Sequence, residues 1–344
     1  MEILLGLLII AIGAFCQSSC YVPINKIKNW SWESYWIVQG IFAWLVFPLL
    51  VALLAVPAGH SLFELFAGAD SFRLSMTVLF GVLWGIGGLT FGLSMRYLGV
   101  ALGQSIALGT CAALGTIMGP VLLNVFFPEL DALSTLTAAV VIGVVATLVG
   151  IAIIGVAGAM KSASLSEEEK KAAVKDFNFP KGIVIALLAG FMSGCFNVGL
   201  EFGKDINFGD LTNPMFHTLP ATLLVTFGGF ITNAVYCFYQ NGKNHTWGDY
   251  KNGGVWANNL LFCALAGALW YSQFFGLSLG KGFLTSSPTL MTLSFCILMA
   301  LNVTFSNVWG IILKEWKGCS SKTIAVLIAG ILVLIVSCFL PQLV

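Results

Sequence analysis

The stretch ILLGLLIIAIGAFCQSSCYV at residues 3–22 contains no charged side chain. A helix of about 20 apolar residues is long enough to cross the roughly 30 Å hydrocarbon core of a bilayer. Apolar runs of similar length, separated by short polar breaks, follow along the rest of the chain. We therefore expect an all-α polytopic membrane protein with ten transmembrane helices, at residues 3–22, 35–56, 74–95, 100–124, 134–157, 182–200, 215–239, 256–279, 288–313 and 323–340.

The composition also indicates a membrane protein. Of the 344 residues, 58% are hydrophobic and 9% are charged, whereas a soluble domain has roughly 25% charged residues. The net charge of +1 is spread over many short loops, so nucleic acid is not expected as a partner. The nine cysteines include no CxxC pair, and we interpret them as small buried side chains rather than metal or redox ligands. We expect no cofactor and no metal.

Lysine and arginine residues predict the orientation in the membrane. Only Arg73, Lys204 and Lys281 follow even-numbered spans, and the other 13 of the 16 basic residues follow odd-numbered spans. Loops rich in basic residues stay on the cytoplasmic side. Both termini are therefore expected to be periplasmic, and the polar stretch at residues 158–181 is expected to be a cytoplasmic linker. An interfacial aromatic belt is expected from Trp30, Trp32, Tyr35 and Trp36.

The two halves of the chain are weakly similar. GLLIIAIGAFC at Gly6–Cys16 is similar to GIVIALLAGFM at Gly182–Met192, and GVLW and FGLS within residues 81–94 are similar to GALW and FGLS within residues 267–278. These matches link the first span with the sixth and the third with the eighth. Because a unit of five spans is odd, the second unit must be inverted in the membrane, as in many secondary transporters. We expect two inverted five-helix repeats, at residues 1–157 and 182–344.

Glycine is frequent, with 38 residues, and several pairs are spaced by four. Small residues at this spacing let helix backbones approach closely in lipid. We expect such packing for the pairs Gly81/Gly85, Gly88/Gly92, Gly99/Gly103 and Gly115/Gly119. The denser group around Gly87 is also consistent with a locally loosened helix that lines a cavity.

The spans contain neutral polar and aromatic side chains rather than catalytic groups. No GxSxG or Walker-type motif is present and no His, Cys and Asp residues share a metal-binding spacing, so an enzyme is not expected. Amides donate and accept hydrogen bonds, and tryptophan rings stack on the apolar faces of sugars, which suits a neutral polyol. For any single side chain an interhelical hydrogen bond is the alternative role. The expected substrate-binding residues are Gln17, Trp84, Asn197, Asn233, Trp270 and Gln273.

The motif NVGLEFGKD at residues 197–205 is the strongest ionisable cluster. Its Asn197, Glu201 and Asp205 are spaced by four, so we expect them to share one face at the outer end of the sixth span. A carboxylate beside a cavity can carry a coupling proton, and so can a histidine such as His217. The expected proton-coupling residues are therefore Glu201, His217 and Asp205. A surface ion pair at the helix end is the alternative.

Four stretches together resemble a known family. They are CYVPINKIKNWSWESYW at Cys20–Trp36, WGIGGLTFGLSMRYLG at Trp84–Gly99, LWYSQFFG at Leu269–Gly276 and LKEW at Leu313–Trp316. In their order and spacing they resemble the L-rhamnose-proton symporter family, within the drug/metabolite transporter superfamily. The resemblance implies secondary active import of a 6-deoxyhexose, with L-rhamnose expected, across a bacterial inner membrane by proton symport and alternating access.

Other functions stay open at this point. A sodium-coupled or uniport carrier of another sugar would use the same fold, and a membrane sensor or scaffold would adopt it without moving solute. The expected partners are a small-molecule sugar, a proton and the lipid bilayer, and no obligate protein partner is evident.

Overall fold

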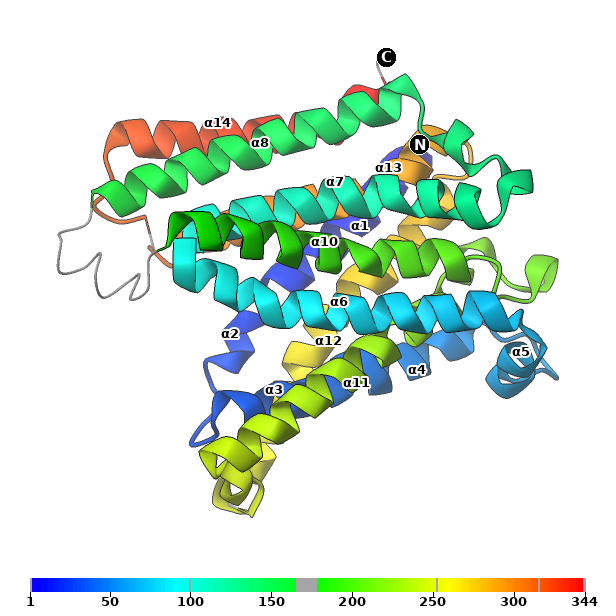
Figure 1. Cartoon of the computed structure of the whole chain (residues 1–344), viewed down its shortest axis with the longest axis horizontal. Helices are drawn as coiled ribbons and strands as arrows, with labels where there is room; N and C mark the ends of the chain where they lie inside the picture. The colour runs from blue at the N-terminus through cyan, green and yellow to red at the C-terminus, as the bar shows by residue number, and fades with distance from the viewer. Residues whose placement is uncertain (1, 99, 165–177, 252, 315, 343–344) are drawn as a thin grey trace. The chain divides into compact units, whose positions relative to one another are not determined.

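The computed structural model describes residues 2–98, 100–164, 178–251, 253–314 and 316–342, and these residues form helices and no strands (Figure 1). In this described part, ten helical segments are long and apolar enough to cross a membrane. They are Glu2–Ile24, Trp32–Ala55, Ser71–Met95, Gly103–Phe126, Ala138–Ala163, Pro180–Gly203, Pro214–Asn244, Gly253–Phe283, Pro288–Ile312 and Ser321–Gln342. Each overlaps one expected span, so the prediction of an all-α polytopic protein with ten transmembrane helices is confirmed.

The chain forms two compact units. Unit 1 comprises Met1–Gly85 and Phe202–Phe283, and unit 2 comprises Ile86–Glu201 and Leu284–Val344. Each unit therefore combines segments from both halves of the sequence. The division into inverted repeats stays a prediction. Of the expected linker, the first residues continue the helix α8 (Ala138–Ala163), and residues 165–177 lie outside the described residues.

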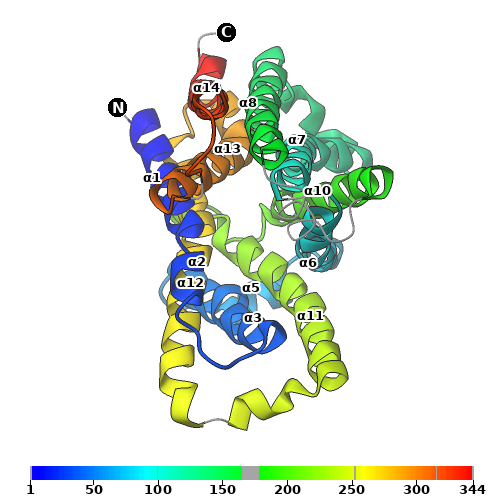
Figure 2. The same ribbon diagram turned by 90° about the vertical axis from the view of Figure 1, so that its left-hand side faces the viewer.

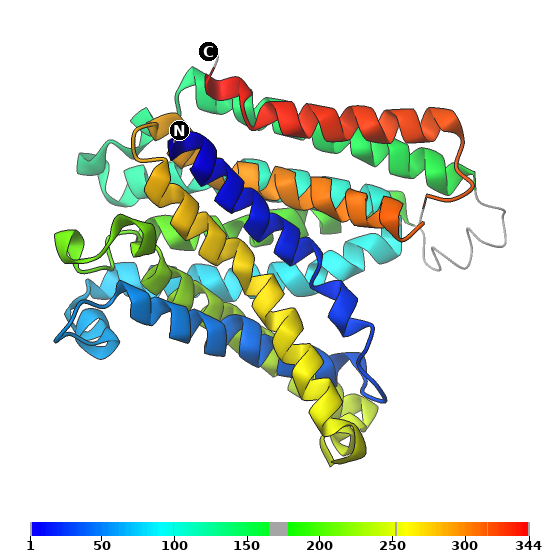
Figure 3. The same cartoon turned by 180° about the vertical axis from the view of Figure 1, so that it is seen from behind.

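The helices of unit 1 pack around α12 (Gly253–Phe283). Helix α1 (Glu2–Ser18) lies along α12 (Figure 3), because Gly13 brings the α1 backbone close to Ser272. Helix α3 (Trp32–Gly40) contacts both α11 (Leu219–Asn244) and α12 (Figure 2). The unit also contains α2 (Tyr21–Ile24), η1 (Ile41–Val46), α4 (Phe47–Ala52), η2 (Leu53–Ala55), α5 (Leu62–Gly68), the first part of α6 (Ser71–Leu98), η5 (Gly209–Leu211), η6 (Pro214–Phe216) and η7 (Thr246–Lys251).

The second span contains a π-helical turn, η1, that the sequence reading did not predict. The amide of Phe47 donates to the carbonyl of Phe42, five residues earlier. Pro48 gives the physical reason, because it has no N–H to donate to the carbonyl of Trp44 and its ring clashes with that carbonyl in a regular α-helix. The wider turn keeps the span helical across the proline.

The short helix α5 was also missed, although the sequence carries a signal for it. Ser61 is its N-cap, and the Ser61 hydroxyl oxygen accepts a hydrogen bond from the Glu64 amide at 3.1 Å. A serine followed by glutamate three residues later is the pattern of a capping box. The helix buries Leu62 and Leu65 against a cluster that includes Ile206. This short helix therefore covers the end of unit 1 beside Arg73 and Asp205.

In unit 2, α8 and α14 (Ser321–Ser337) lie side by side (Figure 1). Gly150 and Gly330 allow this approach, because a Cβ atom at either glycine would lie 2.6 Å from a side chain of the facing helix. A buried hydrogen bond of 3.1 Å joins the hydroxyl groups of Thr147 and Ser337. The unit also contains the rest of α6, α7 (Val100–Phe126), η3 (Pro128–Leu130), η4 (Ala132–Thr135), α10 (Phe179–Gly203), α13 (Pro288–Ile312) and η8 (Leu340–Gln342).

The glycine pairs have different surroundings. A Cβ atom at Gly81 would overlap the carbonyl oxygen of Val225 on α11, and one at Gly85 would lie 2.9 Å from the carbonyl oxygen of Gly229. In contrast, no described atom lies within 4 Å of a Cβ at Gly88. Helix α6 is continuous through this region. The packing prediction is therefore confirmed for the first pair, while Gly99 of the third pair lies outside the described residues.

Replacing Gly81 by alanine is expected to destabilise the protein by about 1–3 kcal/mol, because the new methyl group meets main-chain atoms that cannot move independently. Thermal unfolding of the purified protein in detergent measures this effect. Gly88→Ala on the same helix is the control, and its melting temperature should stay equal or rise, since alanine favours a helix over glycine. Equal melting temperatures for the two variants would contradict the packing argument.

Candidate functional site

Three tryptophan side chains meet inside unit 1, and we call them the tryptophan cluster: Trp44 in η1, Trp84 in α6 and Trp270 in α12. The ring centroids of Trp84 and Trp270 are 5.7 Å apart, and the Trp44 centroid is 6.1 Å from the first and 6.0 Å from the second. Trp84 and Trp270 are partly exposed, whereas Trp44 is buried. The structure thus brings together two predicted binding residues and adds Trp44, which the sequence reading did not select.

Glycines fix the positions of two of these rings. A Cβ atom at Gly40 would overlap the six-membered ring of Trp44, and one at Gly229 would overlap the same ring of Trp84. Each indole therefore lies directly on a helix backbone. Any residue other than glycine would place a Cβ atom that overlaps the ring, so both positions require glycine. The close contact with the backbone sets the orientation of both rings.

Asn233 on α11 holds an aromatic neighbour of the cluster. Its Oδ1 atom accepts a hydrogen bond of 3.0 Å from Nε1 of Trp36, and its Nδ2 atom donates to the carbonyl of Gly229 at 2.8 Å. The Trp36 ring lies 5.8 Å from that of Trp44. Trp36 was expected to belong to an interfacial belt, and it does stack on Trp32 at 5.4 Å, but it also links Asn233 to the cluster.

The other predicted binding residues of unit 1 lie on α1 and α12. Gln273 is buried, and its Nε2 atom donates to the carbonyl of Trp270 at 3.2 Å. Its backbone faces Gly13 of α1. Gln17 lies one turn further along α1, and its Oε1 atom accepts a hydrogen bond from the neighbouring hydroxyl of Ser18 at 3.5 Å. Gln273 therefore lies on the same helix as Trp270, and Gln17 lies on α1, which packs along that helix.

Asn197 and Glu201 lie on α10 in unit 2, one helical turn apart. The Nδ2 atom of Asn197 donates to the carbonyl of Gly115 at 2.8 Å, and its Oδ1 atom is buried and accepts from none of the described residues. The Glu201 side chain packs on Gly119 of α7, where a Cβ atom would lie 2.7 Å from its Cγ. The two side chains present an amide oxygen and a carboxyl group on the same helix.

Helix α10 ends at Gly203, so Asp205 lies two residues beyond it. The prediction that Asn197, Glu201 and Asp205 share one helical face is therefore wrong for Asp205. Its Oδ2 atom forms a salt bridge with Nη1 of Arg73, and the Asp205 side chain is 58% exposed. This geometry is the surface ion pair that the sequence reading kept as the alternative.

His217 lies at the end of η6, just before α11. Its Nε2 atom is 2.8 Å from the carbonyl oxygen of Thr212, so an imidazole N–H at that position donates to the carbonyl. The Thr212 hydroxyl in turn donates to the carbonyl of Ala55 at 2.9 Å. These contacts tie the start of α11 to the end of the second span.

A second polar cluster in unit 1 was not predicted. The buried carboxylate of Glu33 accepts hydrogen bonds from Asn244 at 2.9 Å and Thr246 at 2.8 Å. Asp249 accepts from the backbone amide of Ser31 at 2.8 Å and from its hydroxyl at 2.6 Å. Burial raises the pKa of Asp249, but these hydrogen bonds outweigh burial and hold it below the ordinary value. The cluster fastens the start of α3 to the turn after α11.

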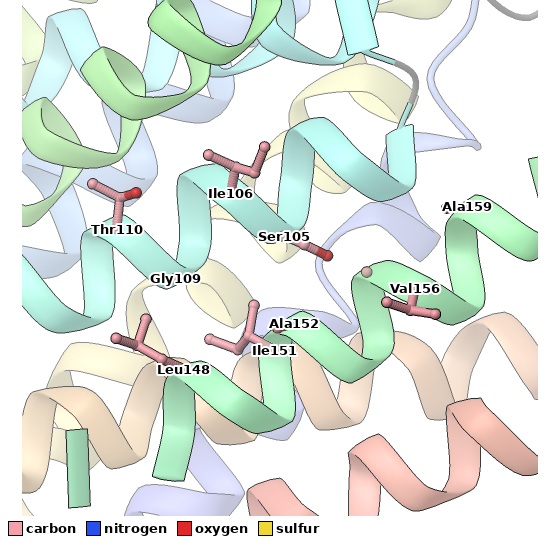
Figure 4. A pocket seen from close by; sticks show the side chains of 10 residues that line it. Ser105, Ile106, Gly109, Thr110, Leu148, Ile151, Ala152, Val156 and Ala159 are labelled. Carbon is pink, nitrogen blue, oxygen red and sulfur yellow. The ribbon is translucent and has the colours of Figure 1, made fainter. Parts of the chain in front are cut away.

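Two hollows outside the tryptophan cluster differ in chemistry. A groove of about 440 Å³ between α7 and α8 is lined mainly by small and aliphatic side chains, with Ser105 and Thr110 as the polar ones (Figure 4). A pocket of about 570 Å³ lies beside the salt bridge of Arg73 and Asp205. Neither contains a residue predicted to bind sugar. Within the described residues, no three His, Cys, Asp or Glu side chains gather as a metal site requires.

A model of the L-rhamnose-proton symport protein (RhaT) family matches residues 1–343. The chain belongs to this family. L-rhamnose-proton symporters of Yersinia pestis (strain Pestoides F) and Yersinia pseudotuberculosis serotype O:1b (strain IP 31758) are each 32% identical to it over 349 residues, which cover 97% of this chain and 96% of the relative. The resemblance seen in the sequence motifs is confirmed, and this family is one of multi-pass transporters rather than enzymes.

Proposed function

We propose that this protein imports L-rhamnose together with a proton across a bacterial inner membrane, with the sugar bound at the tryptophan cluster. The observation that carries the proposal is the meeting of Trp44, Trp84 and Trp270 inside a member of the L-rhamnose-proton symport family. A 6-deoxyhexose has an apolar methyl group and C–H faces, which suit indole rings. Its hydroxyl groups need neutral donors and acceptors, and amide side chains supply them.

Asn233, Gln17 and Gln273 are the amides of unit 1 that we assign to this site. Asn197, in unit 2, stays a predicted sugar-binding residue that we do not place at the cluster. Asn233 orients Trp36, so it acts through the aromatic side chains. The tryptophan rings contact one another in this conformation, so sugar binding requires that they part. Two inverted repeats at residues 1–157 and 182–344 would supply the paired motions of alternating access.

We assign proton coupling to Glu201. It is a carboxyl group within a transmembrane helix and is packed on a glycine of the neighbouring helix, and ionisable groups inside membrane spans are frequently functional. Asp205 is engaged by Arg73 at the surface, and His217 is engaged by the Thr212 carbonyl. Asp205 and His217 are the other candidates for coupling.

Uptake by proteoliposomes tests the function. Vesicles that contain the purified protein should accumulate labelled L-rhamnose when the outside is more acidic, and a protonophore should abolish the accumulation. D-glucose and L-fucose serve as competing sugars, and a sodium gradient at equal pH serves as the control for the coupling ion. Accumulation that follows sodium, or the absence of any L-rhamnose uptake, would contradict the proposal.

The proposed orientation has its own test. A cytoplasmic reporter fused after residue 170 should be active, and a periplasmic reporter fused after residue 344 should be active, because 13 of the 16 basic residues follow odd-numbered spans. Exchanging the two reporters should silence both fusions. The opposite pattern would invert the proposed orientation and place both termini in the cytoplasm.

A further inference from the structure

Four buried polar atoms of unit 1 have no hydrogen-bond partner among the described residues. Three of them belong to elements that meet around the tryptophan cluster: Oε1 of Gln39, Nε1 of Trp44 and the hydroxyl group of Tyr271. The three side chains are only 2%, 3% and 2% exposed. Folded proteins pair the large majority of their buried polar atoms, because an unpaired atom loses its bonds to water without replacement. Three such atoms in one unit therefore call for a function that compensates for this loss.

The three atoms belong to elements that contact one another. A Cβ atom at Gly267 of α12 would lie 3.2 Å from the carbonyl oxygen of Gln39, so the two helices meet at this level. Tyr271 follows Gly267 by four residues and lies on the same face of α12, one turn further on. Trp44 contacts Trp270, the residue before Tyr271, with ring centroids 6.0 Å apart. Gln39 and Tyr271 therefore lie on helices that contact η1 or carry a member of the tryptophan cluster, to which Trp44 itself belongs.

Their chemistry suits hydroxyl groups. An amide oxygen accepts hydrogen bonds, an indole N–H only donates, and a phenol does both, while a sugar hydroxyl can do either. None of the three carries a charge, which suits a neutral ligand. We propose that Gln39, Trp44 and Tyr271 supply the hydrogen bonds to the hydroxyl groups of the carried sugar. This inference rests on the proposed function, and it names the polar side of the same site.

The backbone provides a second, independent observation. Trp44 lies in the π-helical turn η1, and π turns within α-helices are frequent at functional sites. All three side chains are closed off in this conformation, so the sugar meets them only after the cluster opens.

Conservative variants test each atom. Trp44→Phe and Tyr271→Phe remove a polar atom and keep an aromatic ring, and Gln39→Leu removes the amide. Isothermal titration of the full-length protein with L-rhamnose should show about tenfold weaker binding for each variant. For Tyr271→Phe and Gln39→Leu the melting temperature without sugar should stay equal or rise, because an unpaired buried polar atom has been removed. Trp44→Phe also leaves a cavity, so its stability is compared with that of a second buried tryptophan changed in the same way. A purely structural role would instead lower the melting temperature and leave the affinity unchanged.

Trp30→Phe is the matched control. The Nε1 atom of Trp30 is also buried without a partner among the described residues, but its ring packs on Tyr250 and Trp256, at 5.9 Å and 5.5 Å. The same chemical change at this place should leave the affinity for L-rhamnose unchanged. Equal losses in Trp30→Phe and Trp44→Phe would overturn the assignment of Trp44.

Deoxy analogues complete the test. Wild-type protein and variants are titrated with L-rhamnose analogues that each lack one hydroxyl group. One analogue lacks the sugar hydroxyl group that bonds to Tyr271, and it should bind wild-type protein weakly. Its affinity for the Tyr271→Phe variant should be no lower than its affinity for wild-type protein. If wild-type protein binds and transports L-rhamnose while all three variants keep its affinity, the inference fails and the proposed function stands. If wild-type protein neither binds nor transports L-rhamnose, the proposed function fails and this inference falls with it.

Discussion

Replacing Glu201 by glutamine should abolish accumulation of L-rhamnose driven by a pH gradient and leave exchange of L-rhamnose at equal concentrations intact. Glutamine imitates the protonated carboxyl group in shape and charge, so the variant can still pass between states with sugar bound. It cannot release a proton, so the pH gradient no longer performs work. Proteoliposomes measure both activities in the same preparation.

The physical reason is that a coupling group must change its proton affinity between the outward-facing and inward-facing states. Glu201 packs on Gly119 of α7, so the proposed coupling group lies at a contact between two helices. Burial disfavours the charged form of a carboxyl group and water favours it, so a coupling carboxyl group must lie where the two transport states differ in solvent access. A carboxyl group that stays in contact with bulk water in both states would not change its proton affinity in this way.

Two variants serve as controls for Glu201→Gln. Glu129→Gln makes the same chemical change in η3, on an exposed residue, and should keep full accumulation. Glu201→Asp keeps a titratable group and should retain part of the accumulation. If Glu201→Gln accumulates sugar as well as wild-type protein does, coupling belongs to another group, and His217→Gln and Asp205→Asn become the variants to measure.

The ten spans could be predicted from the sequence alone, because each is a continuous apolar run of about 20 residues. Recognising such a run does not require knowing which other helices it packs against. The boundaries were less certain. The expected seventh span ended at residue 239, whereas α11 continues to Asn244. Its last turn is polar, and helical hydrogen bonding continues after the apolar run has ended. Hydropathy reports the length of the apolar segment and not the length of the helix.

The site could be predicted only in part. Trp84 and Trp270 were selected as ring surfaces for a sugar, and they do meet, but Trp44 lies in the apolar run IFAWLVF and resembles a lipid-facing residue. The salt bridge of Arg73 with Asp205 joins residues 132 positions apart. Periodicity tells which residues share a face of one helix, but not which faces of two helices meet.

Replacing Trp270 by alanine should weaken the apparent affinity for L-rhamnose by about 1–3 kcal/mol, on the order of 5- to 150-fold, with expression near normal. Trp84→Ala should have an effect of similar size, since we assign both rings to the same sugar site. The loss should appear in binding as well as in transport, because stacking acts on the bound sugar. Titration calorimetry and concentration-dependent uptake measure the two effects.

Gly229→Ala tests whether the position of the Trp84 ring matters for sugar binding, because it moves the ring without removing it. The added methyl group would overlap the Trp84 ring, so the indole must turn away while every aromatic side chain remains. We expect weaker affinity in the same direction as for Trp84→Ala. Gly242→Ala on the same helix is the control, because a Cβ atom there comes no closer than 3.9 Å to Trp247, and its affinity should equal that of wild-type protein. Unchanged affinity in Gly229→Ala and Trp84→Ala together would move the sugar site away from the tryptophan cluster.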